Sequence, residues 1–198
     1  MEREHYNQLP QAPLITGATY YMPESTVRRR VSMDSAAVEV MTDLLQIGAV
    51  TISAGTLISE AETSMKLHGV RALMVIDGQR RMLGIITASD ILGERPLKLT
   101  HDRGLRHADI SVGDIMTPTE RIDAIEMNDV VHAKVGHILA NLKHSGRQHA
   151  LVIDQTADGR KVIRGIFSTT QIARQLGITL STSEVGRSFA DIEAAIGP

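Results

Sequence analysis

Short apolar runs of strand length alternate with segments of helical periodicity along this chain. In the first half, two such runs at residues 72–76 and 82–87 flank the turn signal Asp77-Gly78. Apolar runs bounded by a turn of this kind are typical of a β-hairpin. A further short strand is expected at residues 50–52, so the pattern predicts one strand followed by a hairpin.

A helix is predicted between that first strand and the hairpin. Ser59 is the expected N-cap, Glu62 stands three residues later in capping-box spacing, and Gly69 ends the helix. A longer helix is predicted in the second half, with Asn128 as its N-cap. Its apolar residues recur at helical spacing and are Val131, Val135, Ile138, Leu139 and Leu142.

The second half also repeats the hairpin. Its strands are expected at residues 149–153 and 162–167, with Asp158-Gly159 in the turn. Short helices are predicted directly after both hairpins, at residues 89–92 and 169–176. Both halves therefore have the same order of elements.

Comparison of the chain with itself indicates that the two halves are copies. The matching segments lie 75, 77 and 81 residues apart, and the offset grows only where loops are expected. The matches are Met-Thr at 41–42 with 116–117, L-M-V-I-D at 73–77 with A-L-V-I-D at 150–154, and G-I-I-T at 84–87 with G-I-F-S at 165–168.

The repeat predicts a division of the chain into five segments. An N-terminal arm, which either wraps the domain or is disordered, is followed by two repeats joined by a linker and by a C-terminal helix that packs on the pair or on a partner chain. The expected ranges are 1–35 for the arm, 36–95 for the first repeat, 96–110 for the linker, 111–178 for the second repeat and 179–198 for the helix, with Ser181 and Glu184 in capping-box spacing.

Composition narrows the fold and the function. Hydrophobic residues make up 42% of the chain but aromatic residues only 3%, which predicts an aliphatic core of strands covered by helices in an α/β (α+β) fold. The formal net charge of -2 provides no general attraction to nucleic acid or to an anionic membrane. The absence of cysteine excludes disulfides and thiolate metal sites. We expect a cytoplasmic protein, because neither a signal peptide nor a membrane-spanning run is evident.

The end of the first hairpin carries the most suggestive chemistry. A strand that ends at Thr87 and turns at once into a short helix presents a hydroxyl, free helix amides and the carboxylate of Asp90 within one turn. A carboxylate accepts hydrogen bonds from both vicinal hydroxyls of a ribose, while the hydroxyl and the amides suit a phosphate. The alternative is that Asp90 only caps its own helix.

The pattern V-x-I, capped helix, L-M-V-I-D, turn, L-G-I-I-T-A-S-D-I-L resembles the CBS domain, named after cystathionine β-synthase, over roughly residues 36–177. The resemblance implies two β-α-β-β-α repeats related by a pseudo-two-fold axis. It also implies pairs that commonly form a homodimer and bind an adenosine-containing ligand between the repeats, namely AMP, ADP, ATP or S-adenosylmethionine.

The resemblance also implies a set of site residues. Thr87, Ser89 and Asp90 match the ribose and phosphate motif in the first copy, whereas Ser168 and Gln171 replace it in the second, so one competent site is expected. The residues expected to line the base are Val50, Ile52, Val70, Arg71, Ala72 and Leu73. The candidate phosphate partners are Arg71, Arg147 and His149, with Arg164 as a weaker choice.

The sequence thus predicts a regulatory module that senses an adenine nucleotide and signals to a protein partner. The alternative is a ligand-free scaffold for dimerisation or interaction. No catalytic motif is present, so no enzyme is expected, and His132 and His137 are five residues apart, which does not suit a helical metal site. Nucleic acid binding has little support beyond Tyr6, Tyr20 and Tyr21 in the arm.

Overall fold

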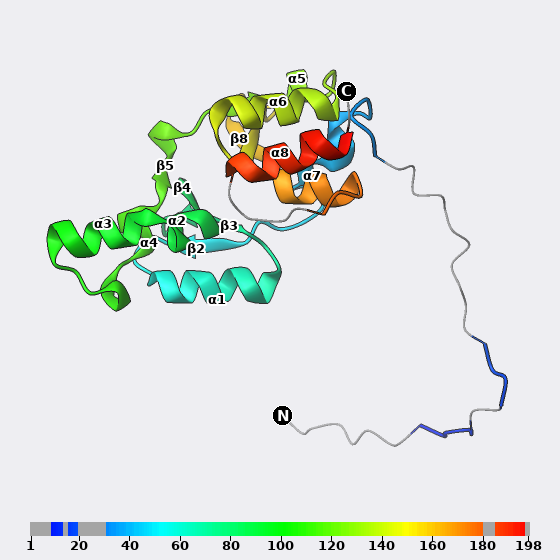
Figure 1. Cartoon of the computed structure of the whole chain (residues 1–198), viewed down its shortest axis with the longest axis horizontal. Helices are drawn as coiled ribbons and strands as arrows, with labels where there is room; N and C mark the ends of the chain where they lie inside the picture. The colour runs from blue at the N-terminus through cyan, green and yellow to red at the C-terminus, as the bar shows by residue number, and fades with distance from the viewer. Residues whose placement is uncertain (1–8, 14–15, 20–30, 180–184, 197–198) are drawn as a thin grey trace.

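Two four-stranded sheets with helices on their outer faces form the body of the protein (Figure 1). The computed structural model describes residues 9–13, 16–19, 31–179 and 185–196. The strand order is β2-β3-β4-β5 in one sheet and β6-β7-β8-β1 in the other. The two sheets therefore have the same topology, as the internal repeat predicts.

The first repeat supplies three strands and two helices. β2 runs parallel to β3, and β3 forms an antiparallel hairpin with β4. The bounds are β2 Thr51–Ser53, α1 Ile58–His68, β3 Ala72–Ile76, β4 Met82–Thr87 and α2 Ala88–Leu92. Strand, helix and hairpin are confirmed, but the expected N-cap Ser59 is wrong. The helix begins at Ile58, and the carboxylate of Glu60 accepts a hydrogen bond from the backbone N–H of Leu57 at 3.3 Å.

The second repeat has the same arrangement with one break. Its elements are β6 Ala124–Glu126, α5 Met127–Val130, α6 Val135–Ser145, β7 His149–Gln155, β8 Lys161–Ser168 and α7 Thr169–Gln175. The single long helix predicted from Asn128 is wrong, because the chain is not helical between α5 and α6. There the carbonyl of Ala133 accepts a hydrogen bond from the N–H of Ala37, and the N–H of Val135 donates to Ser35. A distant segment thus takes the backbone groups that a continuous helix would need.

Each repeat is completed by the segment that precedes the other one. β1 (Thr42–Asp43) pairs with β8, and β5 (Thr117–Pro118) pairs with β4. The short helices η1 (Ala37–Val40) and α4 (Val112–Ile115) cross over in the same way. Ala37 and Val40 belong to the core of the second repeat, while the core of the first repeat includes residues 110, 112 and 115. The two repeats are therefore interlocked.

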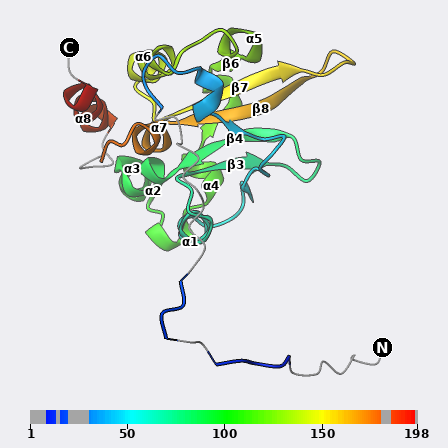
Figure 2. The same cartoon turned by 90° about the vertical axis from the view of Figure 1, so that its right-hand side faces the viewer.

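A third apolar cluster lies between the two sheets. Met74 on β3, Ile85 on β4 and Leu151 on β7 are buried in it. Figure 2 shows the β7–β8 hairpin stacked over the β3–β4 hairpin, which places this cluster in the interface. The cores are aliphatic apart from Phe167 and Phe189, the only phenylalanines of the chain. The two halves thus pack against each other through an apolar cluster between their sheets.

The segment expected as a linker is largely helical. α3 spans Glu94–Arg103 and ends at Gly104, which has a φ of 65° in the left-handed region that favours glycine. A short helix η2 follows at His107–Asp109, and η3 spans Thr119–Arg121. Leu99 packs on the core of the first repeat, which explains why this segment is ordered as a helix.

The C-terminal helix is α8, Val185–Ile196. Phe189 and Ile192 are buried in the core of the second repeat, so this helix packs on the pair. The expected capping residues Ser181 and Glu184 lie outside the described residues, as do Tyr6, Tyr20 and Tyr21 and most of the N-terminal arm. In the described part of the chain, no helix has the length and apolar character needed to cross a membrane.

Candidate functional site

Two clefts lie between the repeats and are related by the internal symmetry. Cleft A has a volume of about 370 Å³ and is lined by the end of β4 and the start of α2 on one side, and by residues 121–123 and 145–149 on the other. Cleft B has a volume of about 400 Å³ and is lined by the matching segments, residues 47–50 and 68–74 together with the end of β8 and the start of α7. Both volumes lie in the range of small-molecule sites.

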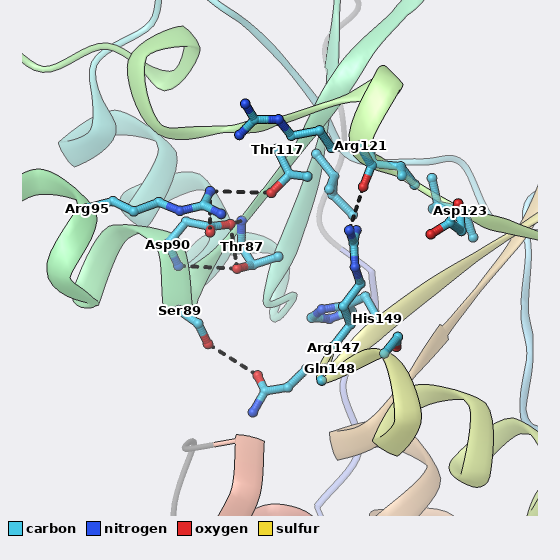
Figure 3. A pocket seen from close by; sticks show the side chains of 15 residues that line it. Thr87, Ser89, Asp90, Arg95, Thr117, Arg121, Asp123, Arg147, Gln148 and His149 are labelled. Atoms are coloured by element: carbon cyan, nitrogen blue, oxygen red, sulfur yellow. Dashed lines mark hydrogen bonds and ion pairs between the residues drawn. The ribbon is translucent and has the colours of Figure 1, made fainter.

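In cleft A, the carboxylate of Asp90 is held against Thr87 (Figure 3). One carboxylate oxygen, Oδ2, accepts hydrogen bonds from the backbone N–H of Thr87 at 2.9 Å and from its hydroxyl at 2.7 Å. The N–H of Asp90 donates back to the Thr87 hydroxyl at 3.2 Å. Asp90 therefore caps α2, as the alternative interpretation expects, and it also lines the cleft.

Arg95 on α3 occupies the other oxygen of the same carboxylate. Its Nη1 lies 2.8 Å from Oδ1 of Asp90. The same nitrogen also donates to the carbonyl of Ile115 at 2.6 Å and to the hydroxyl of Thr117 at 3.3 Å. The side chain of Arg95 is 50% exposed and that of Asp90 only 13%. Arg95 thus connects α2, α3 and the segment that leads into β5.

The opposite wall of cleft A comes from the second repeat. Arg147 donates a hydrogen bond to the backbone carbonyl of Arg121, and the side-chain oxygen of Gln148 lies 3.3 Å from the hydroxyl of Ser89. Figure 3 shows Arg95, Arg121 and Arg147 placed around the cleft. Three guanidinium groups and two carboxylates, those of Asp90 and Asp123, therefore line cleft A as a whole, and the excess of positive charge suits an anionic group.

The structure separates the predicted site residues into two groups. Cleft A is lined by Thr87, Ser89, Asp90, Arg147 and His149. Cleft B is lined by Val50, Val70, Arg71, Ala72, Leu73, Ser168, Gln171 and again His149, while Ile52 lines neither. The expectation that Val50 and the segment from Val70 lie beside Asp90 is therefore wrong.

The physical reason is the exchange of leading segments. Because β5 pairs with β4, the chain that follows β5 forms the wall opposite Asp90, and residues 47–50 occupy the matching place in the other cleft. The residues of cleft A that the sequence did not identify include Arg95, Thr117, Arg121 and Asp123. The offset of 75 identifies residues 117–123 as counterparts of 42–48, but it does not show which sheet they join.

Arg164 lines neither cleft. Its guanidinium forms an ion pair with Asp43 on β1 and lies 3.7 Å from Asp154 on β7. The side chain is only 17% exposed. Arg164 therefore holds β1 against β8, away from the two clefts where a phosphate could bind.

Cleft B differs from cleft A at its polar end. Gln171 stands where cleft A has Asp90, and its Oε1 accepts a hydrogen bond from the hydroxyl of Thr42 at 3.2 Å. No Asp or Glu is among the described residues that line cleft B. In the part of the chain that the structure describes, no group of three or more His, Cys, Asp or Glu is placed to hold a metal ion.

The comparison with known families matches this geometry. The sequence model of the CBS domain matches residues 37–96, and the structure repeats the same strand order in residues 124–175. This chain is a tandem CBS-domain protein. The sequence model covers the first CBS repeat only, and the second is recognised by its identical topology.

Two relatives match the sequence of this chain over part of its length. Inosine-5'-monophosphate dehydrogenase of Bacillus subtilis (strain 168) is 31% identical over 136 residues, which are 64% of this chain but only 26% of that enzyme. An uncharacterized 17.7 kDa protein of Acidianus ambivalens is 28% identical over 137 residues, 69% of this chain and 71% of that protein. The CBS pair thus corresponds to about a quarter of the dehydrogenase.

A solved structure shows the same fold. The crystal structure of an uncharacterized conserved protein from Pyrococcus horikoshii superposes with a TM-score of 0.53 and 24% sequence identity. The match covers 77% of this chain and 100% of that one. It shows that the two chains share a fold and carries no statement about a ligand.

His149 lies in the wall shared by the two clefts of the CBS pair. Its Nδ1 is buried without a hydrogen-bond partner among the described residues. Burial, together with the nearby cation of Arg71, lowers the pKa of His149 to about 4. The imidazole is therefore neutral at neutral pH and presents an uncharged face to both clefts.

The depressed pKa of His149 predicts a pH dependence of stability. Between pH 6.5 and about 4 the unfolded chain binds a proton at this site that the folded chain does not, so the free energy of unfolding falls as pH is lowered through this window. The expected loss is about 3 kcal/mol, from 1.36 kcal/mol per pKa unit. Urea denaturation at pH 7 and at pH 4 measures it.

His149→Ala is the matched variant for this prediction, because Ala72 stands at the equivalent place in the first repeat. Subtracting the two curves removes the contribution of the carboxylates, which titrate in both proteins. We expect the variant to lose clearly less stability than the wild type between pH 7 and pH 4. Parallel curves for the two proteins would contradict the assignment.

Proposed function

We propose that this CBS-domain protein is a regulatory module that binds an adenine nucleotide, AMP, ADP or ATP, in cleft A. The observation that carries the proposal is the convergence of the Thr87–Asp90 turn from one repeat with three guanidinium groups around the same cleft. A carboxylate clamp and a cationic wall are the two groups that a ribose phosphate requires. We infer no catalytic role.

Each part of the nucleotide has a matching surface in this proposal. The ribose hydroxyls donate to the carboxylate of Asp90, and Arg121 and Arg147 bind the phosphate. The purine lies against the buried side chains of Ile85 and Leu151 on the floor of the cleft. A sulfonium ligand such as S-adenosylmethionine is less well suited, because its positive charge would face the same guanidinium groups.

Arg95 offers a way to convert binding into a change of structure. A ribose hydroxyl that donates a hydrogen bond to Oδ1 of Asp90 competes with Arg95, whose Nη1 lies 2.8 Å from the same oxygen. The half-exposed guanidinium then turns toward the phosphate and releases the carbonyl of Ile115 and the hydroxyl of Thr117. Loss of those bonds loosens α3 from Ile115 and Thr117. The protein then has two states, one with these bonds formed and one with them broken, and both the ligand and a protein partner distinguish them.

The proposal includes a cytoplasmic location, a homodimer and a protein partner that distinguishes those two states. The ligand-free scaffold remains the rival, and the engagement of both Asp90 oxygens inside the protein is the observation that favours it. The two functions differ in one measurable property. A ligand that binds only the folded state raises the melting temperature of the protein, whereas the melting temperature of a ligand-free scaffold does not change when a nucleotide is added.

Calorimetric titration of the full chain with AMP, ADP, ATP, adenosine and S-adenosylmethionine tests the proposal. We expect at least one nucleotide to bind, adenosine to bind at least about 10-fold more weakly, and the melting temperature to rise with the nucleotide. If none of the five compounds bound and the melting temperature stayed unchanged, the ligand-free scaffold would be the function that remains.

Arg147→Gln should lower the affinity for AMP by about 10-fold and leave the affinity for adenosine unchanged, because only AMP carries the phosphate that this guanidinium binds. Arg160→Gln is the matched control. It removes the same charge from the β7–β8 turn, where Arg160 pairs with Asp158 and lines neither cleft. Equal effects on AMP and adenosine, or an equal loss in the control, would refute this role for Arg147.

A further inference from the structure

Cleft B has a lining that differs in kind from that of cleft A. Its walls are mainly aliphatic, and its charged residues are Arg71 and Arg174, with no acidic side chain among the described residues that line it. Its aliphatic walls include Leu44, Val50, Val70, Met74 and Ile166. A cleft that is apolar and carries only positive charge attracts an anion with an apolar body.

Two polar atoms in cleft B lack a partner. Nη2 of Arg71 and Nδ1 of His149 are both buried, and neither has a hydrogen bond among the described residues. A buried cationic nitrogen without a partner is costly, since it has lost water and gained nothing in exchange. Among the described residues, these two are the buried side-chain nitrogen and oxygen atoms without a partner, and they depart from the rule that buried polar groups are hydrogen-bonded.

The diol clamp of cleft A is absent from cleft B. Gln171 carries no charge, and its oxygen already accepts the hydroxyl of Thr42. A nucleoside would therefore find apolar walls but no carboxylate for its ribose. What cleft B lacks is a negative charge next to Arg71 that would accept a hydrogen bond from its guanidinium.

We propose that cleft B is a separate binding site for an apolar carboxylate, that is, a small molecule with an apolar body and one carboxylate group. The carboxylate accepts hydrogen bonds from Arg71, and the body lies between Val50, Val70 and Ile166. Arg174 on α7 is exposed and adds positive charge at the cleft. A carboxylate suits the site better than a phosphate dianion, because only one charge has to be removed from water.

The test uses 1-naphthylacetate and its neutral analogue 1-naphthylacetamide, which have the same apolar body. Calorimetric titration of the full chain should show the carboxylate binding at least about 10-fold more tightly than the amide. Arg71→Gln should abolish that preference and leave the affinity for the amide unchanged. Gln is the matched substitution, because Gln148 stands at the equivalent position in the second repeat.

Three outcomes would overturn the proposal. They are equal affinities for acid and amide, no binding of either up to about 5 mM, and a preference for the acid that survives Arg71→Gln. Asp90→Ala separates this site from cleft A, because it should leave 1-naphthylacetate binding unchanged. Saturating AMP should likewise not displace the probe. Direct competition between AMP and the probe would be a fourth contradicting outcome, because the two would then share one site. The comparison of the acid with the amide, in the wild type and in Arg71→Gln, does not depend on whether AMP binds.

Discussion

Replacing Asp90 with alanine should lower the affinity for AMP by about 100-fold. The carboxylate lines cleft A beside Thr87, where we place the ribose, and hydrogen bonds to a charged acceptor contribute about 1.5 to 3 kcal/mol each. The variant should also lose about 1 to 2 kcal/mol of stability, because the N-cap contacts of α2 disappear with the carboxylate. Calorimetry and urea denaturation measure the two effects separately.

Two companion variants make the first prediction specific. Asp90→Asn retains an oxygen that accepts the N–H of Thr87, so it should be more stable than Asp90→Ala and still bind AMP at least about 10-fold more weakly than the wild type. Gln171→Ala alters the equivalent position in cleft B and should change AMP affinity by less than about 2-fold. Equal losses for Asp90→Ala and Gln171→Ala would refute the assignment of the nucleotide to cleft A.

Replacing Gly84 with alanine should destabilise the protein by about 3 kcal/mol and weaken AMP binding as well. A Cβ at this position would lie 2.4 Å from the backbone oxygen of Thr117 and 3.1 Å from Cα of Pro118. Neither is the end of a flexible side chain, so β5 has to move away from β4. That movement shifts Thr117 and the wall of cleft A that follows it.

Gly165→Ala is the symmetry-related control for that variant. A Cβ at Gly165 would meet the side chain of Met41, with Sδ at 2.5 Å, and an unbranched methionine can change its rotamer. We expect a loss of about 1 kcal/mol and no change in AMP affinity. Urea denaturation of both variants, with AMP titration, provides the comparison. If Gly84→Ala were no less stable than Gly165→Ala, the exchange of β1 and β5 between the sheets would be in doubt.

The local elements were predictable to the extent that neighbouring residues determine them. The two hairpins follow from apolar runs on either side of Asp77-Gly78 and Asp158-Gly159, and the structure confirms both. Even here one detail differs. In the first turn the left-handed residue is Arg80, with a φ of 63°, while Asp77 accepts hydrogen bonds from the N–H groups of Gln79 and Arg81.

Helix boundaries were less predictable where distant segments compete for the backbone. Asn128 and the apolar spacing after it favour one long helix, and nothing nearby in the sequence opposes it. The break between α5 and α6 arises because residues 35–37 pair with residues 133–135. Such a pairing is between residues about 100 positions apart, so no local pattern reports it.

The candidate site shows the same division. The turn from Thr87 to Asp90 lies within four residues, and its hydrogen bonds follow from its own sequence. The wall that faces it comes from residues 117–123, more than twenty positions away, and Arg95 reaches the site only because residues 94–103 form a helix. The sequence therefore predicted the turn at Thr87 and Asp90 and did not identify residues 117–123. Of the residues that it placed opposite that turn, Arg147 and His149 line cleft A, whereas Val50 and the segment from Val70 line cleft B.

By itself, the amino-acid sequence determined that the chain consists of two copies of one β/α unit and that the first copy alone ends its hairpin with a threonine and a carboxylate. Only the tertiary structure decided that β1 and β5 exchange sheets, and hence that Val50 and Arg71 belong to a second cleft with a different lining. A two-residue strand has no preference of its own for either sheet. Its place is determined by the packing of residues such as Val40 and Ile115 into the opposite core, a contribution to stability that exists only in the assembled fold.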